Sequence, residues 1–205
     1  MAMITMLKNA RVYAPEALGI QDLWVAGERI IAMESSLPEP PHALTSEIID
    51  LSGAALIPGL IDAHVHVTGG GGEDGPATRV PRLGLSRLTR AGVTSVVGVL
   101  GTDGTTRTIR DLVATTLGLR EQGLNAWCYT GSYEIPPITL TGSVRDDIVF
   151  VDPIIGVGEL AISDHRSSQP TLDEFARVAA DAHVAGLISG KSGVVHVHMG
   201  CLLYT

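Results

Sequence analysis

Cysteine is scarce in this sequence, and long apolar runs are absent. The two cysteines, Cys128 and Cys201, form no Cys-x-x-Cys motif, which argues against a disulfide framework. No run approaches the ~20 consecutive apolar residues of a transmembrane helix. Met1–Lys8 lacks the charged leader and the apolar core of a secretion signal. These absences predict a soluble, cytoplasmic protein without a membrane partner.

Positive charge is also in short supply. The chain has 14 Lys and Arg against 22 Asp and Glu, which gives a net charge of −8 at pH 7 with histidine neutral. Because the basic residues form no cluster, we do not expect a nucleic-acid partner. Lysine is limited to Lys8 and Lys191, so few lysines are available as functional groups.

The N-terminal part of the chain is expected to form a small β-sheet module. With 205 residues, 45% of them hydrophobic, the chain can bury one sizeable core and a small second module. A turn at Ala26-Gly27-Glu28 predicts a hairpin, and the prolines within residues 37–41 predict a loop. The strands expected here are Ile4–Tyr13, Gln21–Val25, Arg29–Met33, Ile48–Leu51 and Ala54–Ile57.

From Ile57 onward, strand patterns alternate with helix patterns. Such alternation, with nearly continuous apolar strands, predicts a parallel sheet covered by helices. The expected strands are Ile57–His66, Thr94–Leu100, Asn125–Thr130, Ile155–Ser163 and Val194–Met199. The expected helical segments are Arg82–Ala91, Ile109–Gln122, Val144–Val151 and Leu172–Ala185, the last starting at a capping box of Thr171 and Glu174.

These five β/α units leave two architectures open. They could form an open doubly wound sheet, whereas a closed barrel needs eight strands and typically ~250 residues. Polar residues follow the C-terminal ends of the strands all round, as at the rim of a barrel, where active sites lie. We therefore favour an α/β fold of the (β/α)8 TIM-barrel type, incomplete in this chain.

A His-x-His pair lies at the end of the first of these strands. Side chains alternate faces along a strand, so His64 and His66 point the same way and can share a divalent cation such as zinc. A lone His-x-His pair is a weak signal. Here, however, an apolar strand precedes it and the glycine-rich loop 69–72 follows it, and then Glu73. We predict a metal site at this position.

Residues after the fourth and fifth strands extend this prediction. Glu159 lies within an apolar strand, where a carboxylate is costly unless it is paired or metal-bound, and metal bridging is the better explanation. His198 repeats the His-x-His pattern, whereas His196, one layer deeper, is expected to be a hydrogen-bonded core histidine.

Several loop residues have more than one interpretation. Arg166 could pair with Asp164, or its planar guanidinium could bind a substrate carboxylate. Tyr133 is by default a packing aromatic with a solvated hydroxyl, and only its loop position suggests more. Asp164 and His165 are expected to be structural.

Together these motifs resemble the amidohydrolase superfamily and, within it, the bacterial isoaspartyl dipeptidases. Pro58-Gly-Leu-Ile-Asp-Ala-His-Val-His66 resembles the first barrel strand of that superfamily, and the resemblance covers about residues 6–200. The narrower match depends on segments Gly69–Glu73, Arg90–Gly98, Gly101–Asp103, Thr141–Ser143, Ala161–Ser167 and His198–Gly200. Residues 1–56 would then form the N-terminal part of a small β-sandwich, and residues 57–205 the first five units of a hydrolase barrel.

The resemblance implies two divalent metal ions, most simply Zn²⁺. His64 and His66 would bind one ion and His198 the other. The family's usual bridging ligand is a carboxylated lysine on the fourth strand, where this chain has Glu159. A glutamate presents the same two oxygens without needing carbon dioxide.

The resemblance also implies a substrate and the residues that hold it. The expected reaction is hydrolysis of the isopeptide bond of β-aspartyl dipeptides. Glu73 would receive the free α-amino group, Tyr133 would stabilise the oxyanion, and Arg166 would hold a substrate carboxylate. Gly71 and Thr102 would lend further contacts.

In the family, the second metal has a further histidine ligand besides the one at position 198, and this histidine, the aspartate general base and a second substrate arginine would all lie beyond residue 205. We therefore expect an incomplete form, a non-catalytic fragment when alone, from a lineage whose full-length members are homo-oligomers. The apolar segment Cys201–Thr205 stands where the family has a polar loop.

Two rival functions remain to be weighed. A cyclic amidase resembling dihydroorotase or hydantoinase would share His64 and His66 but would give no reason for Glu73 beside Tyr133. A relaxed phosphate-loop pattern at Ala185–Ser192 suggests a nucleotide-binding protein, which requires the order strand, loop, helix. Here a helix precedes the loop and a strand follows it, so we disfavour this reading.

Overall fold

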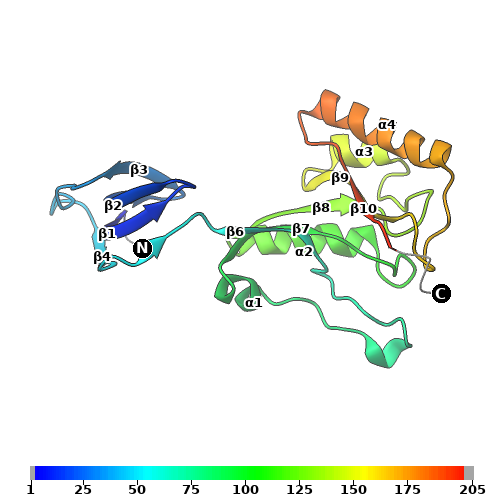
Figure 1. The fold of residues 1–205 in the computed structure, drawn as a ribbon, viewed down its shortest axis with the longest axis horizontal. Helices are drawn as coiled ribbons and strands as arrows, with labels where there is room; N and C mark the ends of the chain where they lie inside the picture. The colour runs from blue at the N-terminus through cyan, green and yellow to red at the C-terminus, as the bar shows by residue number, and fades with distance from the viewer. Residues whose placement is uncertain (1–2, 201–205) are drawn as a thin grey trace. The chain divides into compact units, whose positions relative to one another are not determined.

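The computed structural model describes residues 3–200, which form two compact units divided between Gly59 and Leu60 (Figure 1). The predicted boundary, between residues 56 and 57, lies three residues earlier. Cys201 and the rest of the apolar segment 201–205 lie outside the described residues. Among the described residues, no helix has both the length and the apolar character needed to cross a membrane.

The N-terminal unit is a mixed five-stranded sheet. Its strands are β1 (Ile4–Tyr13), β2 (Ala17–Ala26), β3 (Arg29–Glu34), β4 (Ser46–Asp50) and β5 (Ala55–Leu56). The order is β3-β2-β1-β4, with β5 also paired to β1. The hairpin predicted at residues 26–28 is confirmed, because β2 and β3 pair antiparallel from Ala26 and Arg29 onward. Strand β2 begins four residues before its predicted start, because Ala17 already pairs with Tyr13 of β1.

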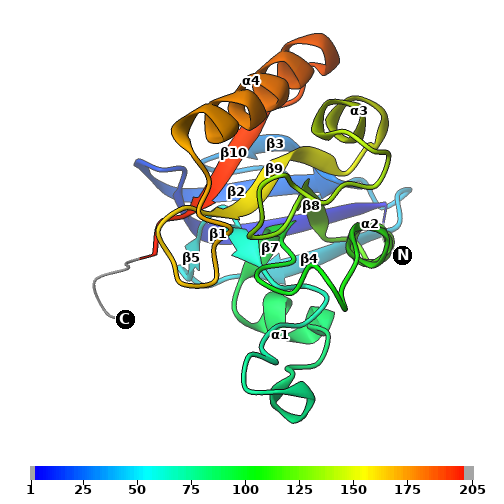
Figure 2. The same cartoon turned by 90° about the vertical axis from the view of Figure 1, so that its right-hand side faces the viewer.

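The second unit is a parallel five-stranded sheet in the order β10-β9-β8-β7-β6. Its strands are β6 (Leu60–Val65), β7 (Val93–Gly98), β8 (Asn125–Thr130), β9 (Ile154–Ala161) and β10 (Val194–His198). Its helices are the 3-10 turn η1 (Pro76–Thr78), α1 (Leu85–Arg90), α2 (Ile109–Glu121), α3 (Val144–Phe150) and α4 (Leu172–Ser189). Figure 2 shows α2, α3 and α4 along the outer face of the curved sheet. The five parallel strands form the predicted half of a TIM barrel.

Three predicted element boundaries in this unit differ from the observed ones by three residues or more, each for a local reason. Strand β6 begins at Leu60 rather than Ile57, since Pro58 has no N–H to donate to a ladder. Helix α1 begins at Leu85 rather than at residue 82, after an extended Gly84. Helix α4 continues past Ala185 to Ser189 and ends where Gly190 adopts a left-handed conformation, with φ of 69°. Its predicted capping box is present.

The core of this unit lies between the sheet and the helices. Apolar side chains from alternate strand positions meet those of the helices and are fully buried there: Val96, Leu112, Ala126, Ile148, Ile154, Leu160 and Ala182. Burial of this surface is the main force that fixes the strand ends, and with them the residues of the rim.

A buried carboxylate fastens the loop after β8, which carries Tyr133. Asp147 of α3 is fully buried. Its carboxylate accepts hydrogen bonds from the backbone N–H groups of Leu140 and Thr141, at 2.8 Å each, and from the hydroxyls of Thr130 and Thr141. One side chain thereby joins strand β8, the loop and helix α3.

Replacing Asp147 with alanine is expected to lower the free energy of unfolding by at least about 3 kcal/mol, because several buried donors lose a charged acceptor. Urea denaturation measures this change. Asp146→Ala, one residue away and exposed at the start of the same helix, is the matched control and should cost less than about 1 kcal/mol. Equal losses in the two variants would contradict the anchoring role of Asp147.

Candidate metal and substrate site

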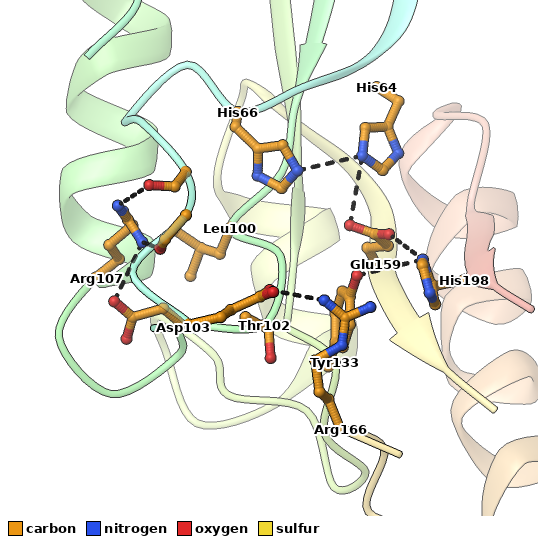
Figure 3. Close-up of a pocket in the computed structure, with 13 residues that line it drawn as sticks. His64, His66, Leu100, Thr102, Asp103, Arg107, Tyr133, Glu159, Arg166 and His198 are labelled. Atoms are coloured by element: carbon orange, nitrogen blue, oxygen red, sulfur yellow. Dashed lines mark hydrogen bonds and ion pairs between the residues drawn. The ribbon is translucent and has the colours of Figure 1, made fainter. Parts of the chain in front are cut away.

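A cavity of about 360 Å³ lies at the C-terminal ends of the parallel strands (Figure 3). All nine residues predicted to bind metal or substrate line it: His64, His66, Gly71, Glu73, Thr102, Tyr133, Glu159, Arg166 and His198. Three of them lie on strands β6, β9 and β10, and the other six lie in the loops that follow β6, β7, β8 and β9. The carboxyl ends of parallel strands share one edge of a sheet, so these residues come together.

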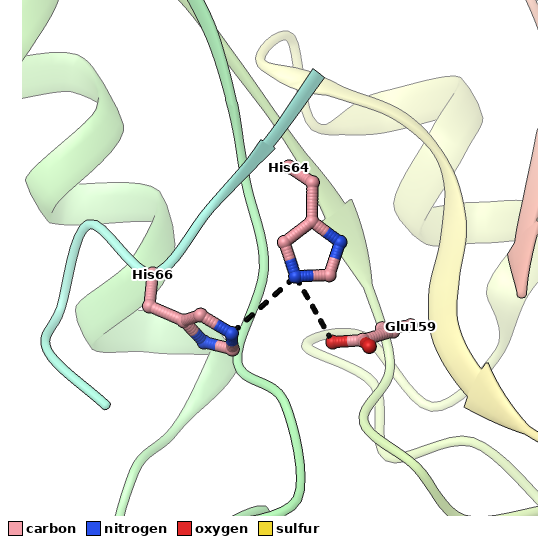
Figure 4. A group of neighbouring side chains, drawn as sticks. All are labelled: His64, His66 and Glu159. Carbon is pink, nitrogen blue, oxygen red and sulfur yellow. Dashed lines mark hydrogen bonds and ion pairs between the residues drawn. The ribbon is translucent and has the colours of Figure 1, made fainter. Parts of the chain in front are cut away.

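His64, His66 and Glu159 form a cluster with the donor set of a metal site (Figure 4). One ligand atom from each lies within 4.8 Å of the others. The Nε2 atom of His64 lies 3.4 Å from the Nε2 atom of His66 and 3.4 Å from Oε2 of Glu159. The side chain of Glu159 is only 3% exposed, and its Oε2 atom has no hydrogen-bond partner. A buried carboxylate oxygen without a donor, facing two imidazoles, fits a divalent cation.

The surroundings of His66 favour its neutral form. Burial lowers the pKa of this imidazole below its ordinary value, although the nearby Glu159 charge acts in the opposite direction. A metal needs the neutral ring. Gly101 makes room for that ring, since a Cβ at position 101 would lie 2.5 Å from Cε1 of His66.

His198 lies on the other side of Glu159. Its Nδ1 atom is 2.9 Å from Oε1 of Glu159, while Oε2 of the same carboxylate faces His64. Glu159 therefore stands between imidazoles of the first and the fifth strands, the placement that a bridging ligand requires.

His196 is hydrogen-bonded, as the sequence predicted, but its partner lies at the mouth of the site. Its Nε2 atom is 2.8 Å from Nδ1 of His64. The ring stacks on Tyr129, with a centroid distance of 5.3 Å. His196 therefore helps to orient the His64 ring, through the ring nitrogen of His64 that does not face His66 and Glu159.

Arg166 pairs with Asp164, the first of the two interpretations left open for it, and its binding of a substrate carboxylate stays a prediction. Its Nε atom donates to Oδ1 of Asp164 at 2.8 Å, and one terminal nitrogen donates to Oδ2 at 2.9 Å. The other terminal nitrogen faces the cavity and donates to Oε1 of Glu73 at 2.6 Å. The two residues predicted to hold opposite charges of a substrate thus hold each other in this structure.

Tyr133 is packed and also reaches the site. Its ring stacks on that of His198, with a centroid distance of 4.8 Å, and the guanidinium of Arg166 lies 5.1 Å from its centroid. Its hydroxyl is 3.2 Å from Nδ1 of His198. Burial raises the pKa of this phenol to about 12, so the hydroxyl keeps its proton at neutral pH.

Sequence reasoning missed Arg107, which supports the glycine-rich loop. Arg107 is 5% exposed and donates to the carbonyl of Gly70 at 2.8 Å and to that of Gly71 at 3.4 Å. It also pairs with Asp103 at 3.2 Å. Gly71 has φ of 62°, and a Cβ there would lie 2.8 Å from the carbonyl oxygen of Thr78. The Asp103-x-x-x-Arg107 spacing was the available signal.

The segment with the relaxed phosphate-loop pattern has a structural role. Helix α4 extends into this segment as far as Ser189, and strand β10 follows it, so the order strand, loop, helix is not present there. Lys191 donates to the carbonyls of Val151 at 2.7 Å and Ile154 at 3.0 Å. The ammonium group of Lys191 therefore holds the turn before β9 in place by hydrogen bonds.

A parallel half-barrel with a His-x-His pair on its first strand and a buried carboxylate on its fourth defines a class, the amidohydrolase superfamily of barrel hydrolases. No family model matches the chain. Solved structures do: the beta-aspartyl dipeptidase of Fervidobacterium islandicum AW-1, in complex with beta-Asp-Leu dipeptide, superimposes with a TM-score of 0.94 at 51% sequence identity. That match covers 98% of this chain and 52% of the other.

A second structure of the same organism's enzyme gives a TM-score of 0.92 at 52% identity, over 97% of this chain and 54% of the other. Dihydropyrimidinase from Brevibacillus agri NCHU1002 gives 0.62 at 20% identity, over 96% and 40%, which shows the fold alone. The chain is a homologue of the beta-aspartyl dipeptidases, within the amidohydrolase superfamily, and it spans about half the length of these relatives.

Proposed function

We propose that this protein is a metal-dependent hydrolase that cleaves the isopeptide bond of β-aspartyl dipeptides. The observation that carries the proposal is the cavity itself. It joins a metal-type cluster of His64, His66 and Glu159 to the charged pair Glu73 and Arg166. The relative that is 51% identical was crystallised with beta-Asp-Leu.

The metal would be held by His64, His66 and Glu159, with His198 and the second oxygen of Glu159 facing a second position. Imidazole and carboxylate donors suit Zn²⁺. When bound, such ions polarise a carbonyl and lower the pKa of a bound water to about 7. Because Glu159 carries its own carboxylate, the site would need no carbon dioxide.

The charged groups of the substrate would be bound by ion pairs with side chains of the cavity. A β-aspartyl dipeptide has a free ammonium beside a carboxylate, and Glu73 and Arg166 offer the complementary pair on one wall of the cavity. Gly71 and Thr102 line the same wall and would complete the contacts. A neutral cyclic amide offers no partner for either charge, which favours the dipeptide.

Tyr133 would act on the oxygen of the scissile carbonyl. A phenol is protonated at neutral pH, and burial raises the pKa of this hydroxyl further above its ordinary value. A fixed O–H donor of this kind stabilises an oxyanion more than it stabilises the ground-state carbonyl.

A substrate panel tests the proposal. Two proteins are loaded with zinc: the 205-residue chain, and a chimera in which the F. islandicum enzyme supplies the half that this chain does not cover. We expect the chimera to release leucine from β-Asp-Leu and to leave dihydrouracil and hydantoin unchanged, as measured by amino-acid and ring-opening assays. Turnover of the cyclic amides alone would replace the proposal with a cyclic amidase, and no turnover at all would reject it.

A further inference from the structure

The segment between β6 and α1 folds back on itself and carries Glu73 near its tip. Gly71 pairs antiparallel with Arg79, and the backbone N–H of Val80 donates to the carbonyl of Gly70 at 2.8 Å. These two pairs form the base of a hairpin, which we call the glycine hairpin. Glu73 follows this base closely and lines the cavity. The position of the base therefore sets the position of the Glu73 carboxylate.

The first arm of the glycine hairpin cannot be ordered by its own side chains. Residues 69–72 are all glycine, and the backbone has φ of 62° at Gly71 and 96° at Gly72. Glycine has no side chain to pack, and it loses more conformational freedom on folding than any other residue. The order of this arm must therefore come from hydrogen bonds to its backbone.

Arg107, in the loop before α2, supplies two of these hydrogen bonds. One terminal nitrogen donates to the carbonyl of Gly70 and the other to the carbonyl of Gly71. The second nitrogen also pairs with Asp103. A guanidinium is a rigid, planar group with five N–H donors, so it can bond two successive carbonyls and a carboxylate at once. The single nitrogen of a lysine cannot reproduce that arrangement.

Asp103 connects this arginine to the loop after β7. Its Oδ1 atom accepts from the backbone N–H groups of Thr105 at 3.2 Å and Thr106 at 2.7 Å. The carboxylate is thereby fixed within its own loop while its Oδ2 atom faces Arg107. The loop that contributes Thr102 to the cavity and the hairpin that contributes Glu73 are thus held together through Arg107.

We propose that Arg107 is a positioning residue that gives the site its preference for a free α-amino group, because it holds the glycine hairpin where Glu73 meets that group. This inference rests on the proposed function. The described residues offer the Glu73 carboxylate one ion-pair partner, Arg166. A substrate ammonium competes with that partner. The backbone anchor at Arg107 then has to keep the carboxylate in place.

The test compares Arg107→Lys with Arg110→Lys in the zinc-loaded chimera. Arg110 is exposed on α2 and is the matched control. The measured quantity is the kcat/KM for β-Asp-Leu divided by that for N-succinyl-leucine, the same compound without its amino group. Misfolded or metal-free enzyme lowers both kcat/KM values equally, so a purely structural role of Arg107 leaves the ratio unchanged.

We expect the ratio to fall about threefold or more in Arg107→Lys, because at least one carbonyl of the hairpin loses its charged donor. The ratio should keep its wild-type value in Arg110→Lys. Asp103→Asn removes the counter-ion of Arg107 and should lower the ratio in the same direction. An unchanged ratio in a folded Arg107→Lys overturns the proposal, and where that variant does not fold, an unchanged ratio in Asp103→Asn overturns it.

Hydrogen exchange in the 205-residue chain separates this inference from the proposed function. The amide of Val80, which donates to the Gly70 carbonyl, should exchange about tenfold faster in Arg107→Lys than in the wild type or in Arg110→Lys, because the base of the hairpin opens more often. If the wild-type chimera cleaves neither compound, the proposed function fails, and the exchange rate still decides whether Arg107 holds the hairpin. An unchanged rate overturns that role.

Discussion

Replacing Glu159 with glutamine is expected to weaken zinc binding by more than about 100-fold, because even residues that only orient a metal ligand change affinity 10- to 100-fold. The variant keeps the shape of the side chain but loses the charge that faces His64, His66 and His198. Competition with a chromophoric chelator measures the affinity. Glu121→Gln, an exposed carboxylate at the end of α2, is the control and should bind zinc like the wild type.

Urea unfolding with and without zinc distinguishes a metal ligand at position 159 from a carboxylate that only stabilises the fold. Burial of a carboxylate oxygen without a donor destabilises the metal-free protein. Metal-free Glu159→Gln should therefore unfold at the same urea concentration as the wild type or a higher one, while zinc should stabilise only the wild type. Removing bicarbonate from the buffer should not change zinc binding by the wild type. Unchanged zinc affinity in the variant would reject the metal site.

In the chimera described above, replacing Glu73 with glutamine is expected to remove most of the preference for a substrate with a free α-amino group. A hydrogen bond between charged groups is worth about 1.5–3 kcal/mol, or roughly 10- to 100-fold in kcat/KM. N-succinyl-leucine is β-Asp-Leu without that amino group, so the ratio of the two kcat/KM values isolates the contact. The wild-type ratio should be roughly 10 or more, and the ratio for Glu73→Gln should approach 1.

Arg166→Gln provides the contrast for this measurement. It removes the partner of the carboxylate that both compounds share, so it should lower both kcat/KM values and leave their ratio nearly unchanged. If Glu73→Gln keeps the wild-type ratio, Glu73 does not bind the amino group. The ion pair between Glu73 and Arg166 would then be a purely structural contact.

Much of this site follows from the periodicity of single strands. The two-residue repeat of a strand is enough to place His64 and His66 on one face, and the alternation of strands with capped helices is enough to predict a parallel sheet. Because parallel strands end at a common edge, the sequence also predicted that Glu159 and His198 would lie near the first pair. The prediction for Arg166 stopped at two alternatives, since on local sequence Asp164 and a substrate carboxylate are equally good partners for a guanidinium.

The sequence by itself thus determined the order of the elements, the direction of the strands and the set of residues at their ends, because each depends on local spacing and on burial. Only the tertiary structure decided which of those residues touch. Glu73 meets Arg166 across 93 positions, and Asp164 meets His198 across 34. Such partners are set by how the loops pack over the ends of the strands. Hydrogen bonds between residues far apart in the chain produce no periodic pattern in the sequence, so the sequence alone does not predict them.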